Sequence, residues 1–148
     1  MGCDIHLHIE VKIEGIWHHY AAPSINRNYY LFEKMAGVRG DVNNAISPPK
    51  GFPNNATELT NIVYQNEECD SHSVSWLGID EIMKLEDWLK SISTKETDGY
   101  AKYDLEYGIL RTYLGGDSFT GWKRDPEVGS PLSPAMVEDV RFIFWFDN

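Results

Sequence analysis

The residues with the clearest chemical potential lie in one strip near the start of the sequence. Four polar residues alternate there with apolar ones, and these are Asp4, His6, His8 and Glu10. In an extended strand this alternation puts all four side chains on one face, with successive members roughly 6–7 Å apart. Imidazole and carboxylate groups together bind zinc, manganese or iron. The strip therefore predicts a divalent-metal site, with His6, His8 and Asp4 among its ligands.

A metal held by two strand histidines needs further ligands from elsewhere in the chain. The best source is Asp70-x-His72, which repeats the Asp-x-His spacing in a polar segment. His72 is therefore the expected third histidine ligand. Further candidates are Glu67, Glu68 and one member of the pair His18 and His19. The competing interpretation is that an amphipathic strand simply needs a solvated polar face.

A bound metal would make hydrolysis the natural chemistry. The ion would lower the pKa of a bound water and polarise a phosphoryl or carbonyl oxygen. Glu10, Glu67 or Asp70 would then act as the general base. Arg27 and Arg39 could hold a phosphate through bidentate contacts, and Tyr29 could stack on a base or a sugar. Surface ion pairs with the excess of carboxylates are the more ordinary explanation of each arginine, and packing of a helix on the sheet explains Tyr29 equally well.

The two cysteines do not suggest a catalytic thiol or a disulfide framework. Cys3 shares the alternation phase of Ile5, so a buried structural thiol is expected rather than a nucleophile. Cys69 lies in a polar segment and is expected to be exposed. Two cysteines are too few for a disulfide-stapled fold, which favours a reducing compartment. No Gly-x-Ser-x-Gly elbow and no Walker-type loop occurs in the sequence.

Period-two patterns predict the sheet. Strict alternation over residues 4–13 predicts a strand, and Glu14-Gly15 predicts a turn into a second arm over 16–20. The segment 137–148 is strongly strand-forming and too apolar for an exposed edge. It is therefore expected inside the sheet, beside the first strand.

Helical spacing and turn residues predict the remaining elements. Helices are expected at 29–36, between Asn28 as N-cap and Gly37 as C-terminal cap, at 79–92 and at 103–114. The segment 57–65 is ambiguous between helix and strand, and 117–134 is loop-like. The stretch 38–55 predicts a long loop that could cover or line a site. Four tryptophans are expected in the core, namely Trp76, Trp88, Trp122 and Trp145. The prediction is one α+β domain: a small mixed or antiparallel sheet, adjacent N- and C-terminal strands, and about three helices packed on it.

Composition limits the partners. The chain has 148 residues, the size of one ordinary domain, and its formal net charge is −10. This charge speaks against a nucleic-acid backbone or an anionic membrane as partner. No apolar run approaches the roughly 20 residues of a membrane-spanning helix, and the first residues do not resemble a signal peptide. A cytoplasmic setting is therefore expected, and oligomeric state is not indicated.

The motif Asp4-x-His6-x-His8 resembles the opening metal motif of the polymerase-and-histidinol-phosphatase phosphoesterases. Those proteins place Asp-x-His-x-His at the end of the first strand of a barrel. The likeness covers five positions, and a chain of 148 residues is too short for that barrel. The resemblance implies the coordination chemistry of a metal-dependent phosphoesterase, without the fold.

A second resemblance is scattered over most of the chain. The start, from Met1 to His6, is similar to that of a group of small proteins encoded by tailed bacteriophages and prophages. Segments 27–29, 36–39, 70–77 and 137–148 resemble the same group. This implies a phage origin and a setting in the host-cell cytoplasm, and it supplies no catalytic residues. It singles out the same two segments, around His6 and His72, that the chemistry indicates.

Two functional hypotheses follow. The leading one is a small phage-encoded metal-dependent hydrolase acting on a phosphoester or nucleotide-like substrate. The alternative is a non-catalytic phage binding protein that captures a host defence protein or a nucleotide signal. In the alternative, residues near His6, His72, Arg27 and Arg39 would form a ligand pocket, and the acidic surface would suit a basic host protein.

Overall fold

The computed structural model describes residues 2–93, 113–114, 119–125 and 137–148. Within these residues, four strands form one antiparallel sheet in the order β2-β1-β4-β3. The strands are β1 (Asp4–Ile13), β2 (Ile16–Ala21), β3 (Ser71–Gly78) and β4 (Val137–Asp147). The helices are α1 (Tyr29–Ala36), α2 (Glu58–Glu67), α3 (Ile79–Ser93) and α5 (Phe119–Arg124), with 3-10 turns at Val42–Asn44 and Glu68–Asp70. This arrangement confirms the α+β prediction.

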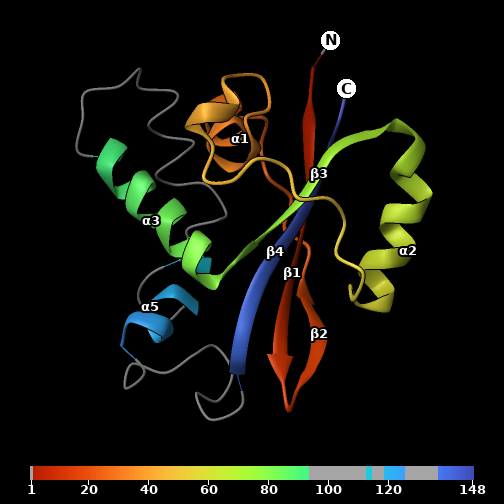
Figure 1. Cartoon of the computed structure of the whole chain (residues 1–148), viewed down its shortest axis with the longest axis vertical. Coiled ribbons are helices and arrows are strands. Elements are labelled where there is room, and N and C mark those ends of the chain that lie inside the picture. Colours follow the sequence, from red (N-terminus) through yellow and green to blue (C-terminus); the bar gives the residue numbers. More distant parts are fainter. Residues whose placement is uncertain (1, 94–112, 115–118, 126–136) are drawn as a thin grey trace.

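Helices cover both faces of the sheet. Figure 1 shows α1, α3 and α5 on one side of the strands and α2 on the other side. The face under α1 and α3 carries the apolar residues of β1 and is called the apolar face below. The face under α2 carries Asp4, His6, His8 and Glu10 and is called the polar face.

The two central strands come from opposite ends of the described chain. β4 pairs with β1 from Asp4 opposite Asp147 to Ile13 opposite Val137. Phe142, Phe144 and Phe146 of β4 point to the apolar face, and every residue of β4 from Val140 to Phe146 is buried. The expectation that this strand lies inside the sheet beside the first strand is confirmed.

The hydrophobic core fills the space between the apolar face and helices α1 and α3. Its largest fully buried members there include Phe32, Met35, Ile82, Leu85, Phe142, Phe144 and Phe146. Both predicted caps of α1 are present. The Asn28 side chain accepts hydrogen bonds from the backbone N–H groups of Tyr30 and Leu31, and Gly37 has a left-handed φ of 76°.

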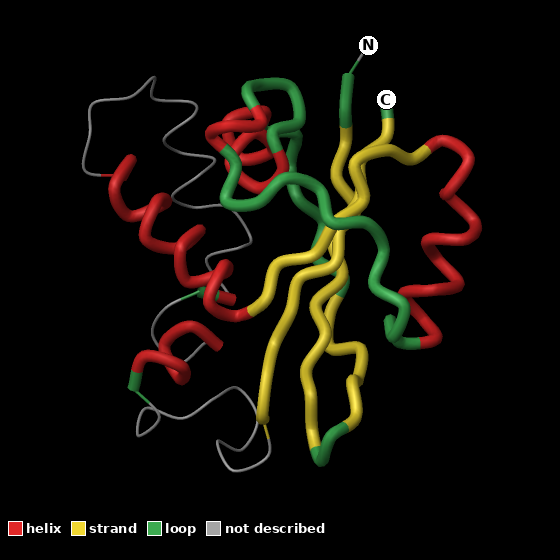
Figure 2. Tube along the Cα trace, viewed as in Figure 1, coloured by secondary structure: helices red, strands yellow, loops and turns green. Residues whose placement is uncertain are grey.

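The loop after α1 carries the chain from one face of the sheet to the other. In Figure 2 it runs from α1 past the strands to α2. It is fastened to the edge strand β3, since the Gly51 N–H donates to the Val74 carbonyl at 2.9 Å. The Lys50 N–H donates to Ser75 Oγ at 3.0 Å. Residues 53–57 of this loop thereby reach the polar face.

Three elements were not defined by the sequence patterns. Residues 58–65 of the ambiguous segment 57–65 lie in α2, whose weak apolar pattern follows from packing on a polar face. Residues 71–78 form β3, whose alternation is interrupted at Ser73, a residue with φ of 55°. Part of the loop-like segment 117–134 is α5, which has only six residues and too few turns to show a helical period. The helix expected at 103–114 lies outside the described residues except for Tyr113 and Leu114.

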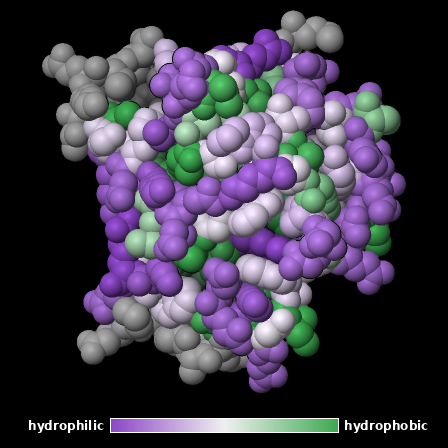
Figure 3. Space-filling model, viewed as in Figure 1, coloured by the Kyte–Doolittle hydropathy of each residue, from purple (hydrophilic) through white to green (hydrophobic). Residues whose placement is uncertain are grey.

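Polar side chains cover most of the surface seen in Figure 3, and hydrophobic ones form small separate patches. The exposed large hydrophobic residues are Ile16, Tyr20, Tyr30, Val42, Leu59 and Ile62. Among the described residues, no helix has the length and apolar character needed to cross a membrane.

Candidate functional site

The strip predicted on the first strand exists, but most of it is covered. Asp4, His6, His8 and Glu10 share the polar face, as expected from their spacing. Helix α2 and the loop before it bury the inner half of the strip, where His8 is 6% and Glu10 0% exposed. Asp4 and His6 remain partly exposed, at the end of the sheet.

Glu10 forms a buried ion pair with Arg141. Arg141 donates from Nε and Nη2 to Glu10 Oε1 at 3.0 and 2.7 Å. Glu10 Oε2 accepts from the Thr57 N–H, Thr57 Oγ1 and Thr60 Oγ1 at 3.0, 2.6 and 2.7 Å. Burial alone would raise the pKa of Glu10, but these hydrogen bonds outweigh it and hold the pKa below its ordinary value. Glu10 therefore anchors the start of α2, an arrangement unlike that of a general base facing a substrate.

Arg141 also fixes the loop that precedes α2. Its Nη1 donates to Asn55 Oδ1 at 2.7 Å, and its Nη2 donates to the Asn55 carbonyl at 3.0 Å. The guanidinium lies 3.9 Å from the centroid of the Trp17 ring. Arg141 thus links β4, β1, β2 and the loop, and its Nε, Nη1 and Nη2 atoms all donate to protein acceptors.

His6 lies between two carboxylates. Its Nε2 is 2.7 Å from Asp147 Oδ2, and its Nδ1 is 3.5 Å from Glu67 Oε2. Glu67 Oε2 also accepts from Trp145 Nε1 at 2.8 Å. Both ring nitrogens of His6 therefore face protein acceptors.

His8 pairs with a histidine of the neighbouring strand. Its Nδ1 is 2.9 Å from His19 Nε2, and its ring stacks on Trp145 with centroids 5.1 Å apart. Burial, aided by repulsion from His19, lowers the pKa of His8 to about 4. Burial also lowers the pKa of His19. At neutral pH both rings are therefore uncharged, and one donates its N–H to the other. Of the pair His18 and His19, it is His19 that joins the strip.

His72 lies on the opposite, apolar face. Its Cα partner is Phe146, and its Nε2 is 4.0 Å from Cys3 Sγ and 3.3 Å from Asn148 Oδ1. The reason is the bulge at Ser73. Between the pairs Ser75–Phe144 and His72–Phe146, β3 uses one residue more than β4, which moves His72 to the other face. The structure therefore does not bring His72 together with His6 and His8.

No group of three or more His, Cys, Asp or Glu side chains among the described residues is arranged to hold a metal ion. The partners that the structure gives His6 and His8 are Asp147, Glu67 and His19. The predicted set of His6, His8, His72 and Asp4 is not gathered at one point. Asp70, the second candidate base, is exposed at the end of the turn between α2 and β3.

The three predicted substrate-binding residues gather around Cys3 at the end of the sheet. Arg27 forms a two-pronged ion pair with Asp4, at 2.9 and 3.0 Å, which holds the pKa of Asp4 below its ordinary value. The Tyr29 hydroxyl accepts from the Cys3 N–H at 3.1 Å, and the Arg39 guanidinium lies 5.2 Å from the Tyr29 ring centroid. These contacts tie all three residues to the protein itself.

Cys3 is fully buried, as its alternation phase predicts. Burial raises the pKa of its thiol, and a hydrogen bond with Arg39 only partly offsets this. The thiol is therefore protonated at neutral pH, which fits a structural residue better than a nucleophile.

A cavity of about 360 Å³ lies on the polar face beside the Glu10–Arg141 pair. Its walls come from β2, the loop before α2, β3 and β4. The lining residues are Trp17, Pro53, Asn54, Asn55, Trp76, Gly78, Asp139, Val140 and Arg141. Its volume falls within the roughly 300–1,000 Å³ typical of small-molecule sites.

The walls of this cavity are flat and aromatic. Trp17, stacked on Arg141, forms one wall, and Trp76, with the Lys50 ammonium 3.7 Å from its ring centroid, forms another. Both cations have carboxylate partners, because Arg141 pairs with Glu10 and Lys50 pairs with Glu81. The cations that lie against the aromatic walls are therefore already neutralised by carboxylates of the protein.

The floor of the cavity is open at Gly78. This residue lies opposite Arg141 in the sheet, and a Cβ added there would meet nothing closer than Trp76 Cζ3 at 3.7 Å. Trp76 was expected in the core, but it is only half-buried because it borders this space. One sequence signal for the site existed: Arg141 is the single charged residue in the run from Val140 to Phe146.

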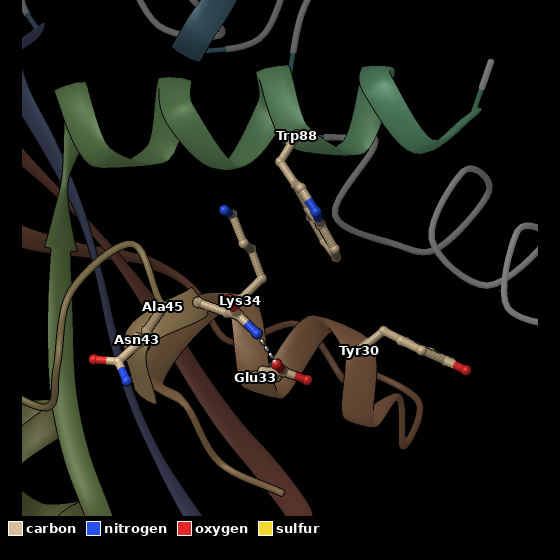
Figure 4. A pocket seen from close by; sticks show the side chains of 7 residues that line it. Tyr30, Glu33, Lys34, Asn43, Ala45 and Trp88 are labelled. Carbon is tan, nitrogen blue, oxygen red and sulfur yellow. Dashed lines mark hydrogen bonds between the residues drawn. The ribbon is translucent and has the colours of Figure 1, made fainter. Parts of the chain in front are cut away.

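A second cavity, of about 470 Å³, lies between α1, the turn at Val42–Asn44 and α3. In Figure 4 Lys34 and Trp88 point toward one another across it, and Tyr30 points away. Its polar groups contact one another, since Asn44 Nδ2 donates to Glu33 Oε1 at 2.6 Å. The Lys34 ammonium lies 5.9 Å from the Trp88 ring centroid. Trp88, expected in the core, is half-buried at this cavity.

No protein-family model, curated protein or solved structure matches the chain. Function is therefore inferred from the geometry of the two faces of the sheet.

Proposed function

We propose that the protein is a non-catalytic binding protein whose ligand carries a nucleobase, and that the base enters the cavity between Trp17 and Trp76. The observation that carries this proposal is the pair of half-buried indoles around a charge-balanced arginine. It develops the binding hypothesis of the sequence analysis, with a nucleotide or nucleoside as the captured molecule.

Stacking supplies the affinity in this proposal. Every nucleobase has a π-face, and base–aromatic stacking is worth about 1–3 kcal/mol per base when the aromatic residue is replaced by alanine. Guanidinium planes serve the same purpose as aromatic rings. The Trp17–Arg141 stack and the Trp76 ring therefore each offer a stacking platform in the cavity.

Phosphate groups contribute little to the affinity. The donors of Arg141 are engaged by Glu10 and Asn55, and Lys50 is paired with Glu81. The net charge of −10 also opposes the approach of an anion. A nucleoside is therefore expected to bind at least as tightly as its monophosphate, with little dependence on salt.

The lining of the cavity favours binding over hydrolysis. Among its described lining residues, Asp139 is the one carboxylate, and there is no histidine, cysteine, serine or lysine. Covalent catalysis needs a nucleophile beside a base, and general acid–base catalysis needs groups that share a proton with the substrate. These residues provide neither pair, whereas they do provide stacking surfaces.

Isothermal titration with the four common ribonucleosides and their monophosphates tests the proposal. Trp17→Ala should weaken binding about 5- to 150-fold, the range that corresponds to lost stacking. Gly78→Leu should abolish binding, because the new side chain would project into the open floor of the cavity. Trp88→Ala is the matched control, since it removes an indole at the other cavity and should leave affinity unchanged.

Two results would contradict the proposal. One is the absence of binding by any of these eight compounds at millimolar concentration. The other is binding that Trp17→Ala and Gly78→Leu leave intact. Circular dichroism of each variant would confirm that the sheet is retained.

A further inference from the structure

The specificity of the same cavity can be inferred from its carboxylate. We infer that the base is guanine and that Asp139 selects it, and this inference rests on the proposed function. Stacking alone accepts any base, whereas a carboxylate at the edge of the ring distinguishes one base from another.

Asp139 has acceptor capacity to spare. Its Oδ1 accepts from the backbone N–H of Val140 at 2.8 Å. A carboxylate offers about four acceptor positions on its two oxygens. Lys12 is the Cα partner of Asp139 in β1, but in the described structure it forms no ion pair with Asp139 within 4 Å. The Lys12 ammonium instead lies 5.9 Å from the Trp17 ring centroid.

The other charged groups at the cavity disfavour a cationic ligand. Arg141 and Lys50 already place positive charge against Trp17 and Trp76. Lys12 also lies over Trp17, so cations already occupy cation–π positions at both indoles, and a cationic ligand would gain little from these rings. An uncharged ring that presents hydrogen-bond donors to Asp139 still gains from stacking.

Guanine meets this requirement best among the common bases. Its Watson–Crick edge carries two adjacent donors, N1–H and the 2-amino group, which can bind the two oxygens of one carboxylate side by side. Adenine, cytosine and uracil have no two adjacent donors on that edge. If one oxygen of a carboxylate accepted from their donor, the second oxygen would face an acceptor.

Comparing guanosine with inosine tests the inference, because inosine keeps N1–H and the stacking ring but lacks the 2-amino group. Guanosine should bind at least 10-fold tighter than inosine and adenosine. Asp139→Asn should reduce the guanosine-to-inosine ratio to near one while leaving inosine affinity within a few-fold. Asparagine keeps an oxygen for the Val140 N–H, so the fold should be retained.

The outcomes separate the two claims. Guanosine preference that Asp139→Asn removes supports the inference. Equal binding of all nucleosides, lost in Trp17→Ala, overturns guanine selection and leaves the proposed function standing. Guanosine preference that survives in Asp139→Asn overturns the assignment to Asp139. Failure of every nucleoside to bind overturns both.

Discussion

The Glu10–Arg141 pair determines what the polar face can offer to a ligand. Glu10 neutralises Arg141 by accepting from its Nε and Nη2, and it also accepts from the hydroxyl groups of Thr57 and Thr60. The guanidinium therefore brings no unbalanced charge to the cavity. Arg141 then presents its flat surface to Trp17. Glu10, which was predicted to be a general base, thus holds in place the arginine that lines the cavity.

Replacing Glu10 with glutamine should destabilise the protein by about 3 kcal/mol or more. The change would leave the Arg141 guanidinium, which is 6% exposed, buried without its counter-ion. Urea unfolding monitored by circular dichroism measures the effect. Asp4→Asn is the matched control, because it breaks an exposed ion pair and should leave the free energy of unfolding close to that of the wild type. Equal effects of the two variants would contradict this account.

His8 should make stability depend on pH between about 7 and 4. The pKa of His8 is about 4 in the folded protein, whereas its ordinary value is 6.5. As the pH falls, the unfolded chain therefore takes up this proton at a higher pH than the folded protein does. Its contribution is therefore full above pH 6.5 and is lost as the pH falls toward 4. Between pH 7.5 and pH 5 the free energy of unfolding should fall by about 2 kcal/mol on this account.

The variant His8→Phe isolates this effect, because phenylalanine can stack on Trp145 but cannot take up a proton. Urea unfolding of both proteins at pH 7.5 and pH 5 gives the comparison. The pH-dependent loss should be smaller in His8→Phe by about the same 2 kcal/mol. An unchanged pH dependence in the variant would show that His8 is not the group responsible.

At the scale of elements, residue alternation and helix-capping residues correctly predicted several strands and helices. β1, β4 and α1 were predicted from patterns in their own residues, and the neighbouring position of β1 and β4 followed from the apolar character of residues 137–148. Elements whose pattern depends on distant partners could not be predicted this way. α2 packs on a polar face, and the bulge in β3 changes the face of His72.

The candidate site was harder to predict for the same reason. The strip on β1 was correctly placed on one face, because strand alternation is local. Which side chains cover that strip depends on α2 and the loop before it, which are remote in the sequence. The pairing of Glu10 with Arg141 joins residues 131 positions apart, so no spacing rule could indicate it.

Gly37 and Gly15 provide a test of how α1 ends. Both have φ of 76°, but a Cβ at Gly37 would lie 2.5 Å from Val42 Cα, whereas a Cβ at Gly15 would meet nothing within 4 Å. Gly15→Ala should cost about 1 kcal/mol, the strain of a left-handed residue. Gly37→Ala should cost clearly more, because the following loop must also move. Thermal unfolding of the two variants checks the order, and equal shifts would contradict it.

At the scale of the whole molecule, metal content decides between the two functional hypotheses. We expect untagged protein to contain well below one equivalent of zinc, manganese or iron by mass spectrometry, because the described residues gather no set of three ligands. The comparison is with the double variant His6→Ala/His8→Ala. Near-stoichiometric metal that disappears in this variant would favour the hydrolase hypothesis, which stays a prediction.

The central pair of the sheet has a consequence for the order of events during synthesis. β1 leaves the ribosome more than a hundred residues before its partner β4. Until then, among the described strands, β1 has only the short strand β2 beside it in the sheet and β3 has no partner. Contacts so distant in sequence slow folding, because a long loop must close before they form. The nascent chain is therefore expected to remain without its native sheet until residues 137–147 emerge.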